Sequence, residues 1–218
     1  MNDWLTTKEY LIERDPYLAT LITQYGEPRL FRTVGVEVDL FDSLVNSIIS
    51  QQISTIAANS IRTRLHRLLN TEIFCAEKLI VALESDLNSV GLSRPKCRYI
   101  KSIAIAINEN PNLLSDLRNL DDDEVIERLT RFKGVGVWTA QMLQIFALGR
   151  PDIFSTKDAG LMRGVRVTYF NGETRGLDDV EEVTNKWKPY RSIGSWYMWQ
   201  VANSSPAFSH KKRNSLTS

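Results

Sequence analysis

The chain has 218 residues, of which 43% are hydrophobic and 24% are charged, and its formal net charge is +1. This composition is typical of a globular protein with a substantial core. Two cysteines are too few for a disulfide framework or for a zinc or iron–sulfur centre. No apolar run approaches the about 20 residues that a membrane span requires, and the first residues do not resemble a secretory signal. We therefore expect an intracellular protein with no membrane association.

The charge is unevenly distributed although its sum is close to zero. Acidic residues gather at 121–124 and 178–182, and basic residues gather at 94–101, 131–133 and 163–166. Clusters of this size are usually solvated faces, so they give only weak support for nucleic-acid binding. The small net charge indicates that any non-specific binding to nucleic acid is weak.

Helical signals dominate the chain. Asp15 followed by Pro16 is typical of a helix start, and Gly26 can end that helix. Apolar residues at helical spacing continue from Phe41, and Ser54 can cap the next helix. Sustained alternation of apolar and polar residues is absent, which predicts an all-α fold. Further helices are predicted at 75–83, 94–109, 122–131, 137–148, 158–169, 178–187 and 190–203.

The stretch 129–164 carries the clearest functional signal. A helix that ends near Phe132 is followed by Gly134 and Gly136, and a new helix begins at once. Glycine allows a backbone to approach a phosphate closely, and the free N–H groups at a helix start favour an anion. An ordinary turn after a helix end is the alternative, but the flanking helix pair favours a phosphate site.

The predicted phosphate-binding hairpin consists of Lys133, Gly134, Val135, Gly136 and Thr139. Backbone carbonyls in such a turn, here those of Phe132 and Gly134, can hold a structural monovalent cation. No organic cofactor and no catalytic metal are expected.

Four segments, one of them within 129–164, carry a resemblance to one known family, and they occur in the order of that family. They are LVNSIISQQISTIAANSIRTRL (44–65), GLSRPKCRYIKSIA (91–104), FKGVGVWTAQM (132–142) with IFSTKDAGLMRG (153–164), and WKPYRSIGSWYMWQ (187–200). Together they resemble the helix-hairpin-helix DNA glycosylase superfamily. The likeness is greatest to the 3-methyladenine DNA glycosylase II branch, which removes alkylated bases.

The resemblance implies two helical subdomains that flank a DNA-binding cleft. A central subdomain is expected at 41–150, and it ends in the helix-hairpin-helix motif at about 122–148. The N-terminal helices in 1–40 are expected to pack with a C-terminal subdomain at 151–203, which carries the catalytic loop. The polar tail 204–218 is expected to be flexible.

The resemblance places the catalytic aspartate of the family on Asp158. Cleavage of an N-glycosidic bond builds positive charge on the deoxyribose, and a nearby carboxylate stabilises that charge and can activate water. Asp158 is also a candidate helix N-cap, and both roles are compatible. Ser155, Lys157 and Ala159 depart from the pattern of the family, which leaves the range of substrates open.

The resemblance also assigns residues to base flipping and to the base pocket. Gln52 occupies the position that fills the gap left by a flipped nucleotide, although it is equally compatible with an ordinary polar turn. Ser54 either contacts the minor groove or caps the next helix, and we favour the cap. Trp138 and Trp199 match aromatic positions that stack on cationic bases, and Met142 either lines the same wall or is core.

Trp138 occupies the position of the lysine that forms a Schiff base in bifunctional relatives. Because an indole cannot form an imine, we expect a monofunctional glycosylase without lyase activity. The expected substrate is duplex DNA with alkylated bases such as 3-methyladenine and 7-methylguanine, and the protein is expected to act as a monomer in base excision repair. The alternatives are a glycosylase of the same fold for deaminated or oxidised bases, and a non-catalytic helix-hairpin-helix DNA-binding protein.

Overall fold

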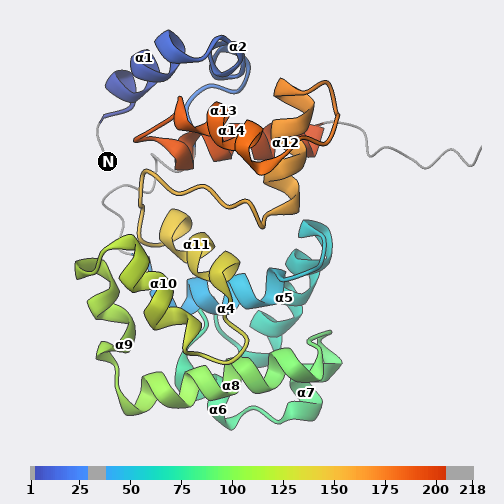
Figure 1. The fold of residues 1–218 in the computed structure, drawn as a ribbon. Coiled ribbons are helices and arrows are strands. Elements are labelled where there is room, and N and C mark those ends of the chain that lie inside the picture. The colour runs from blue at the N-terminus through green and yellow to red at the C-terminus, as the bar shows by residue number, and fades with distance from the viewer. Residues whose placement is uncertain (1–2, 29–37, 205–218) are drawn as a thin grey trace, which may run out of the picture. The chain divides into compact units, whose positions relative to one another are not determined.

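The computed structural model describes residues 3–28 and 38–204, and every regular element within them is a helix (Figure 1). The predicted all-α class is therefore confirmed. Most of the tail predicted at 204–218 lies outside the described residues. No helix in the described part of the chain is long and apolar enough to cross a bilayer.

Internal contacts divide the chain into two units. Residues 29–155 form the first unit, and residues 2–28 join 156–218 in the second. The first unit thus runs a few residues past the predicted subdomain 41–150 at its C-terminal end.

The first unit is organised around α4 (Leu40–Ser50), which is contacted by α5, α8, α9 and α11 (Figure 1). Leu44, Ile48 and Ile49 of α4 are fully buried, as expected for a helix that is covered on several sides. The other helices of this unit are α5 (Thr55–Leu69), α6 (Ala76–Val81), α7 (Glu84–Ser89), α8 (Arg94–Glu109), α9 (Asn112–Ser115), α10 (Asp122–Thr130) and α11 (Val137–Phe146), with a 3-10 turn at Asp116–Asn119.

In the second unit, α14 (Arg191–Ser204) contacts α2, α12 and α13. Hydrogen bonds join the N-terminal helices to the C-terminal segment: the Tyr10 hydroxyl donates to the Lys188 carbonyl at 2.6 Å, and the Tyr197 hydroxyl donates to the Gly26 carbonyl at 2.7 Å. The remaining helices of this unit are α1 (Trp4–Arg14), α2 (Pro16–Tyr25), α12 (Ala159–Tyr169) and α13 (Leu177–Asn185).

Asp15 connects three parts of the second unit. Its Oδ1 accepts hydrogen bonds from the backbone N–H groups of Tyr17 and Leu18 at 2.9 and 3.1 Å, which confirms the predicted start of α2. Its Oδ2 accepts hydrogen bonds from the Tyr169 hydroxyl at 2.7 Å and from the Trp187 indole at 2.8 Å. Asp15 is only 1% exposed, and a buried carboxylate requires such donors.

Gly164 allows α12 and α14 to approach closely. A Cβ atom at this position would lie 2.1 Å from the Met198 carbonyl oxygen, so no larger residue fits without a shift of one helix. This contact fixes the start of α12, where Asp158 lies, relative to α14.

Candidate functional site

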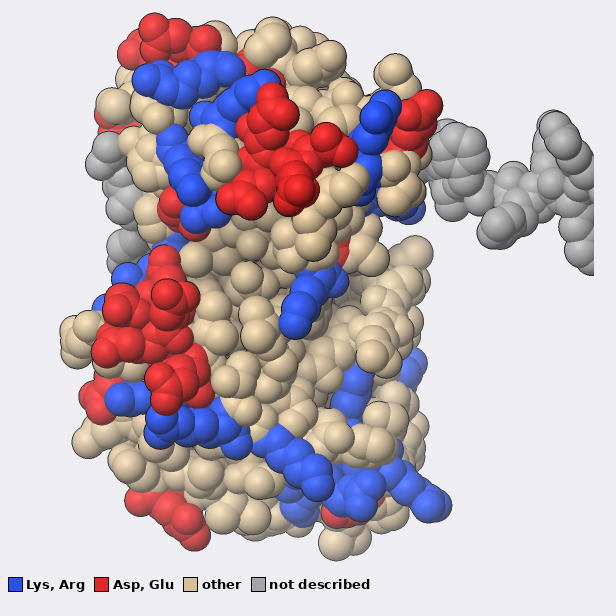
Figure 2. Space-filling model, viewed as in Figure 1, with Lys and Arg blue, Asp and Glu red and all other residues tan. Residues whose placement is uncertain are grey.

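The acidic clusters of the sequence lie at the starts of two helices, whereas basic residues spread over a face of the first unit (Figure 2). In the acidic cluster at the start of α10, the Asp121 and Glu124 side chains form a capping box, and in that at the start of α13 the Asp179 carboxylate accepts from the Gly176 N–H. Both acidic clusters thus complement helix N-termini. In the first unit, Lys and Arg side chains spread over the face that carries α8 and the turn before α11 (Figure 2).

In the turn between α10 and α11, backbone conformation and packing within the first unit both require glycine at position 134. Gly134 has a φ of +89°, which side-chain-bearing residues rarely adopt. A Cβ atom there would also lie 2.1 Å from the Tyr99 ring, which packs on this turn from α8. The turn is closed by a hydrogen bond from the Val135 N–H to the Phe132 carbonyl at 3.0 Å.

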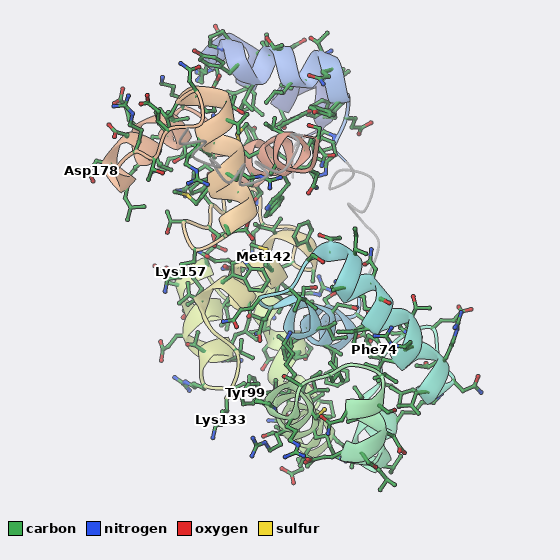
Figure 3. All side chains as sticks on the ribbon, turned by 90° about the vertical axis from the view of Figure 1, so that its right-hand side faces the viewer. Phe74, Tyr99, Lys133, Met142, Lys157 and Asp178 are labelled. Atoms are coloured by element: carbon green, nitrogen blue, oxygen red, sulfur yellow. The ribbon has the colours of Figure 1, made fainter. Side chains whose placement is uncertain are left out.

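Gly136 differs, because no residue in the described part of the chain requires a glycine there. Its φ of −98° is accessible to any residue, and a Cβ atom would meet no atom of the described residues within 4 Å. Gly136 is exposed at the N-terminus of α11, where backbone N–H groups lack intrahelical acceptors. Lys133 projects outward from the same turn (Figure 3). An open helix start beside a lysine is suited to bind an anion.

Two other residues of the hairpin are buried. Val135 is 5% exposed and Thr139 is 2% exposed. The Thr139 hydroxyl faces inward and accepts a hydrogen bond from Gln51 Nε2 at 2.9 Å. Thr139 can therefore offer a phosphate its backbone N–H in the first turn of α11, and its hydroxyl serves the fold.

The carbonyls named for a structural cation already accept hydrogen bonds. Phe132 O accepts from the Val135 N–H, and Gly134 O accepts from Gln51 Nε2 at 2.9 Å. A carbonyl oxygen has two lone pairs, so each atom keeps one for a further partner. The cation stays a prediction.

The turn between α4 and α5 presents Gln52 to solvent. Gln52 has a φ of +56° and an exposed side chain. Ser54 caps α5, since its hydroxyl accepts from the Ala57 N–H at 3.2 Å, and the favoured role for Ser54 is confirmed. Ile53 and Ile56 beside Gln52 are 39% and 83% exposed. The exposure of these two isoleucines was not predicted from the sequence, where they are two apolar residues within the segment 44–65.

Asp158 is the N-cap of α12. Its Oδ1 accepts a hydrogen bond from the Leu161 N–H at 2.6 Å and a second from the Trp199 indole Nε1 at 3.0 Å. The side chain is half-buried, whereas Lys157 is exposed and points outward (Figure 3). The cap role is thus confirmed, and it leaves the carboxylate held by two donors on one oxygen.

The aromatic residues assigned to the base pocket lie in both units. Trp199 of α14 lies beside Asp158 in the second unit. Trp138 and Met142 lie one turn apart on α11 in the first unit, with Trp138 half-buried and Met142 5% exposed. The structure therefore brings together Trp199 with Asp158, and Trp138 with Met142.

Comparisons with known proteins give a consistent result. Residues 45–190 match the HhH-GPD superfamily of base excision DNA repair proteins. An alkylbase DNA glycosidase-like protein of Schizosaccharomyces pombe is 29% identical over 92% of this chain and 94% of its own length. DNA-3-methyladenine glycosylase 1 of the same yeast is 30% identical over 74% of this chain and 72% of its own.

A solved structure supports the same relationship. It is that of a Schizosaccharomyces pombe 3-methyladenine DNA glycosylase in complex with abasic DNA, and it aligns with a TM-score of 0.79 at 26% identity. The alignment covers 91% of this chain and 97% of that chain.

Proposed function

Because this chain belongs to the HhH-GPD superfamily of base excision DNA repair proteins, we propose that it is a DNA glycosylase for alkylated bases. Its substrates are 3-methyladenine and 7-methylguanine in duplex DNA, consistent with the names of its relatives. The observation that carries this proposal is the pair of donors on Asp158, the Leu161 N–H and the Trp199 indole, which hold a carboxylate at the start of α12.

The role of Asp158 follows from the charge that develops in the reaction. As the N-glycosidic bond breaks, the deoxyribose becomes positively charged, and a fixed carboxylate stabilises it without reorganisation. The same carboxylate can accept a proton from the attacking water. An alkylated purine already carries positive charge, so it departs without a strong general acid. Trp199, whose indole lies beside the carboxylate, supplies an electron-rich ring that attracts a cationic base.

The hairpin anchors the DNA strand through a phosphate. The exposed N-terminus of α11 at Gly136, together with Lys133, provides the anion site, and Gln52 fills the space that the flipped nucleotide vacates. The partner is duplex DNA with a damaged base, and one copy of the chain suffices for this chemistry. No organic cofactor or catalytic metal takes part, and a monovalent cation at the hairpin carbonyls would be structural.

The decisive experiment replaces Asp158 by asparagine. Asparagine is an equally good N-cap, so the variant keeps its fold and its acceptor for Leu161, but it loses the negative charge. Release of 3-methyladenine from alkylated duplex DNA should fall by about 10² to 10⁴ fold, the usual range for such a group, while binding to DNA is retained. Asp178→Asn, at an exposed carboxylate in the first turn of α13, is the matched control and should excise normally. Full excision by Asp158→Asn would refute the assignment.

The same assay tests the absence of lyase activity. Trp138 stands at the predicted Schiff-base position and has no amine, so sodium borohydride should trap no covalent complex between protein and DNA. The product should be an abasic site with an intact strand. A trapped complex would show that another amine, such as that of Lys157, forms an imine.

Lys157 favours a second candidate substrate class. Its ammonium is on the residue next to Asp158 but is exposed and points outward, so it disfavours a cationic base only by a solvent-screened repulsion. A glycosylase for deaminated or oxidised bases, which are neutral, would not meet this repulsion. Excision measured on methylated, deaminated and oxidised bases with the wild type and Lys157→Ala separates the two. Formation of no abasic product from any of them would instead favour a non-catalytic DNA-binding protein.

A further inference from the structure

We propose that Gln51 is a positioning residue that fixes the turn carrying Gln52 to the phosphate-binding hairpin. The inference rests on the proposed function, and it concerns a residue to which that function gives no role. As a consequence, the distance between the phosphate site at Gly136 and the gap-filling side chain of Gln52 is fixed within the first unit before DNA binds.

The amide of Gln51 joins two turns that are far apart in sequence. Its Nε2 donates to the Gly134 carbonyl and to the Thr139 hydroxyl, each at 2.9 Å. One acceptor lies in the hairpin turn and the other in the first turn of α11. A single side chain thus contacts both parts of the predicted anion site from behind, while Gln52, the next residue, faces solvent.

Helix α8 supports both turns from another direction. Lys96 Nζ donates to the carbonyls of Ile49 and Gln51, each at 2.8 Å, and so satisfies acceptors at the C-terminal end of α4. Tyr99, three residues further along α8, packs on Gly134. Residues three apart lie on one helix face, so one face of α8 holds the two turns together.

The backbone at Gln52 shows why such support is needed. Gln52 has a φ of +56°, a region that non-glycine residues seldom occupy. The conformation persists because Gln51 is fixed on one side and Ser54 caps α5 on the other. It turns the Gln52 side chain outward. A strained residue that is held by its neighbours is a feature of functional sites.

Fixed spacing matters when a nucleotide leaves the helical stack. Flipping a base from a paired duplex costs free energy, and a side chain that fills the gap recovers part of it only if it arrives in register. A loose turn would have to become ordered on binding, which weakens the complex. Gln51 should therefore matter where a gap must be filled, and little where no base pair is disrupted.

The test compares single-turnover excision from two DNA substrates. In one the damaged base is paired, and in the other it lies in a single strand. Gln51→Ala should slow excision about tenfold on the paired substrate, equivalent to about 1.4 kcal/mol, and less than about twofold on the single strand. Gln52→Ala should show the same preference, and the double variant should be no slower than either single variant, because Gln51 acts through Gln52. Equal losses on both substrates, or additive losses, would overturn the proposal.

A second measurement keeps the proposal testable if Gln51→Ala folds poorly. Thr139→Val removes one of the two acceptors and keeps the side-chain shape, whereas Thr139→Ser keeps the hydroxyl. Only the valine variant should excise more slowly than the wild type from paired DNA while its rate on single-stranded DNA is unchanged. If valine and serine behave alike, the hydrogen bond has no positioning role.

Failure of the proposed function is recognised separately. A 2-aminopurine placed opposite an abasic site reports by fluorescence whether the gap is filled, without any excision. If the wild type excises no base, the proposed function fails. The fluorescence change on binding, and its loss in Gln51→Ala, still decides whether Gln51 positions the turn.

Discussion

The indole of Trp199 and the backbone N–H of Leu161 donate to the same oxygen of Asp158, at 3.0 and 2.6 Å. The two donors come from α14 and α12, which are packed closely at Gly164. The direction of the carboxylate therefore depends on the helix pair as well as on the cap of α12.

Replacement of Trp199 by phenylalanine should slow base release. The variant keeps an aromatic ring but removes one donor to a charged acceptor, a bond that contributes about 1.5 to 3 kcal/mol. We expect kcat for excision of 3-methyladenine to fall by at least about tenfold and DNA affinity to change little. Trp196→Phe on the same helix is the control, and it should excise like the wild type. If both variants excise equally well, the bond from Trp199 does not orient the carboxylate.

The glycines of the hairpin should respond differently to alanine. Gly134→Ala forces a side chain into a left-handed backbone and against the Tyr99 ring. The free energy of unfolding, measured in urea, should therefore fall by about 1 to 3 kcal/mol. Gly136→Ala has room for its methyl group and an ordinary φ. It should fold normally and bind duplex DNA several-fold more weakly, because the methyl group keeps the phosphate from the backbone.

These two variants share a set of measurements: urea unfolding and DNA affinity at a fixed salt concentration. We expect Gly134→Ala to be the less stable of the two variants. Gly136→Ala should bind DNA more weakly while its free energy of unfolding is unchanged. Normal DNA affinity in Gly136→Ala would show that no phosphate approaches this position.

Features that depend on neighbouring residues could be predicted from the sequence. The start of α2 at Asp15 and Pro16, the cap of α5 at Ser54 and the turn at Gly134 follow from local rules for helix ends. The short helices α7 and α9 were missed, because each buries few apolar residues and shows little periodicity.

Features that depend on distant residues could not be predicted. Asp15 was recognised as a cap, but its bonds to Tyr169 and Trp187 join residues 154 and 172 positions away. The bonds of Gln51 to the hairpin span 83 and 88 positions. Local propensity contains no information on such pairs. In the segment 44–65 the resemblance drew attention to Gln52, while its neighbour Gln51 makes the long-range contacts.

Tyr169 should make the second unit sensitive to alkaline pH. Burial, and then the neighbouring Asp15 carboxylate, raise the pKa of the Tyr169 phenol above its ordinary value. Since the folded pKa is the higher one, the stabilisation is complete below the unfolded pKa of about 10 and is lost as pH rises above it. The free energy of unfolding, measured in urea from pH 8 to 11, should therefore decline above pH 10. The decline should be smaller in Tyr169→Phe, and an equal decline in both would show that Tyr169 does not cause it.

Removal of the Asp15 carboxylate should destabilise the second unit strongly. Asp15→Ala deletes the cap of α2 and leaves the Tyr169 hydroxyl and the Trp187 indole without the acceptor that they share. Loss of a cap costs about 1 kcal/mol, and each buried donor left unsatisfied costs about 1 to 3 kcal/mol. We expect unfolding to be easier by at least about 3 kcal/mol in urea. Asp3→Ala removes the cap of α1, whose exposed carboxylate accepts from the Leu5 N–H and the Thr6 hydroxyl, and should destabilise the protein much less. Equal effects of the two substitutions would mean that Asp15 acts only as a cap.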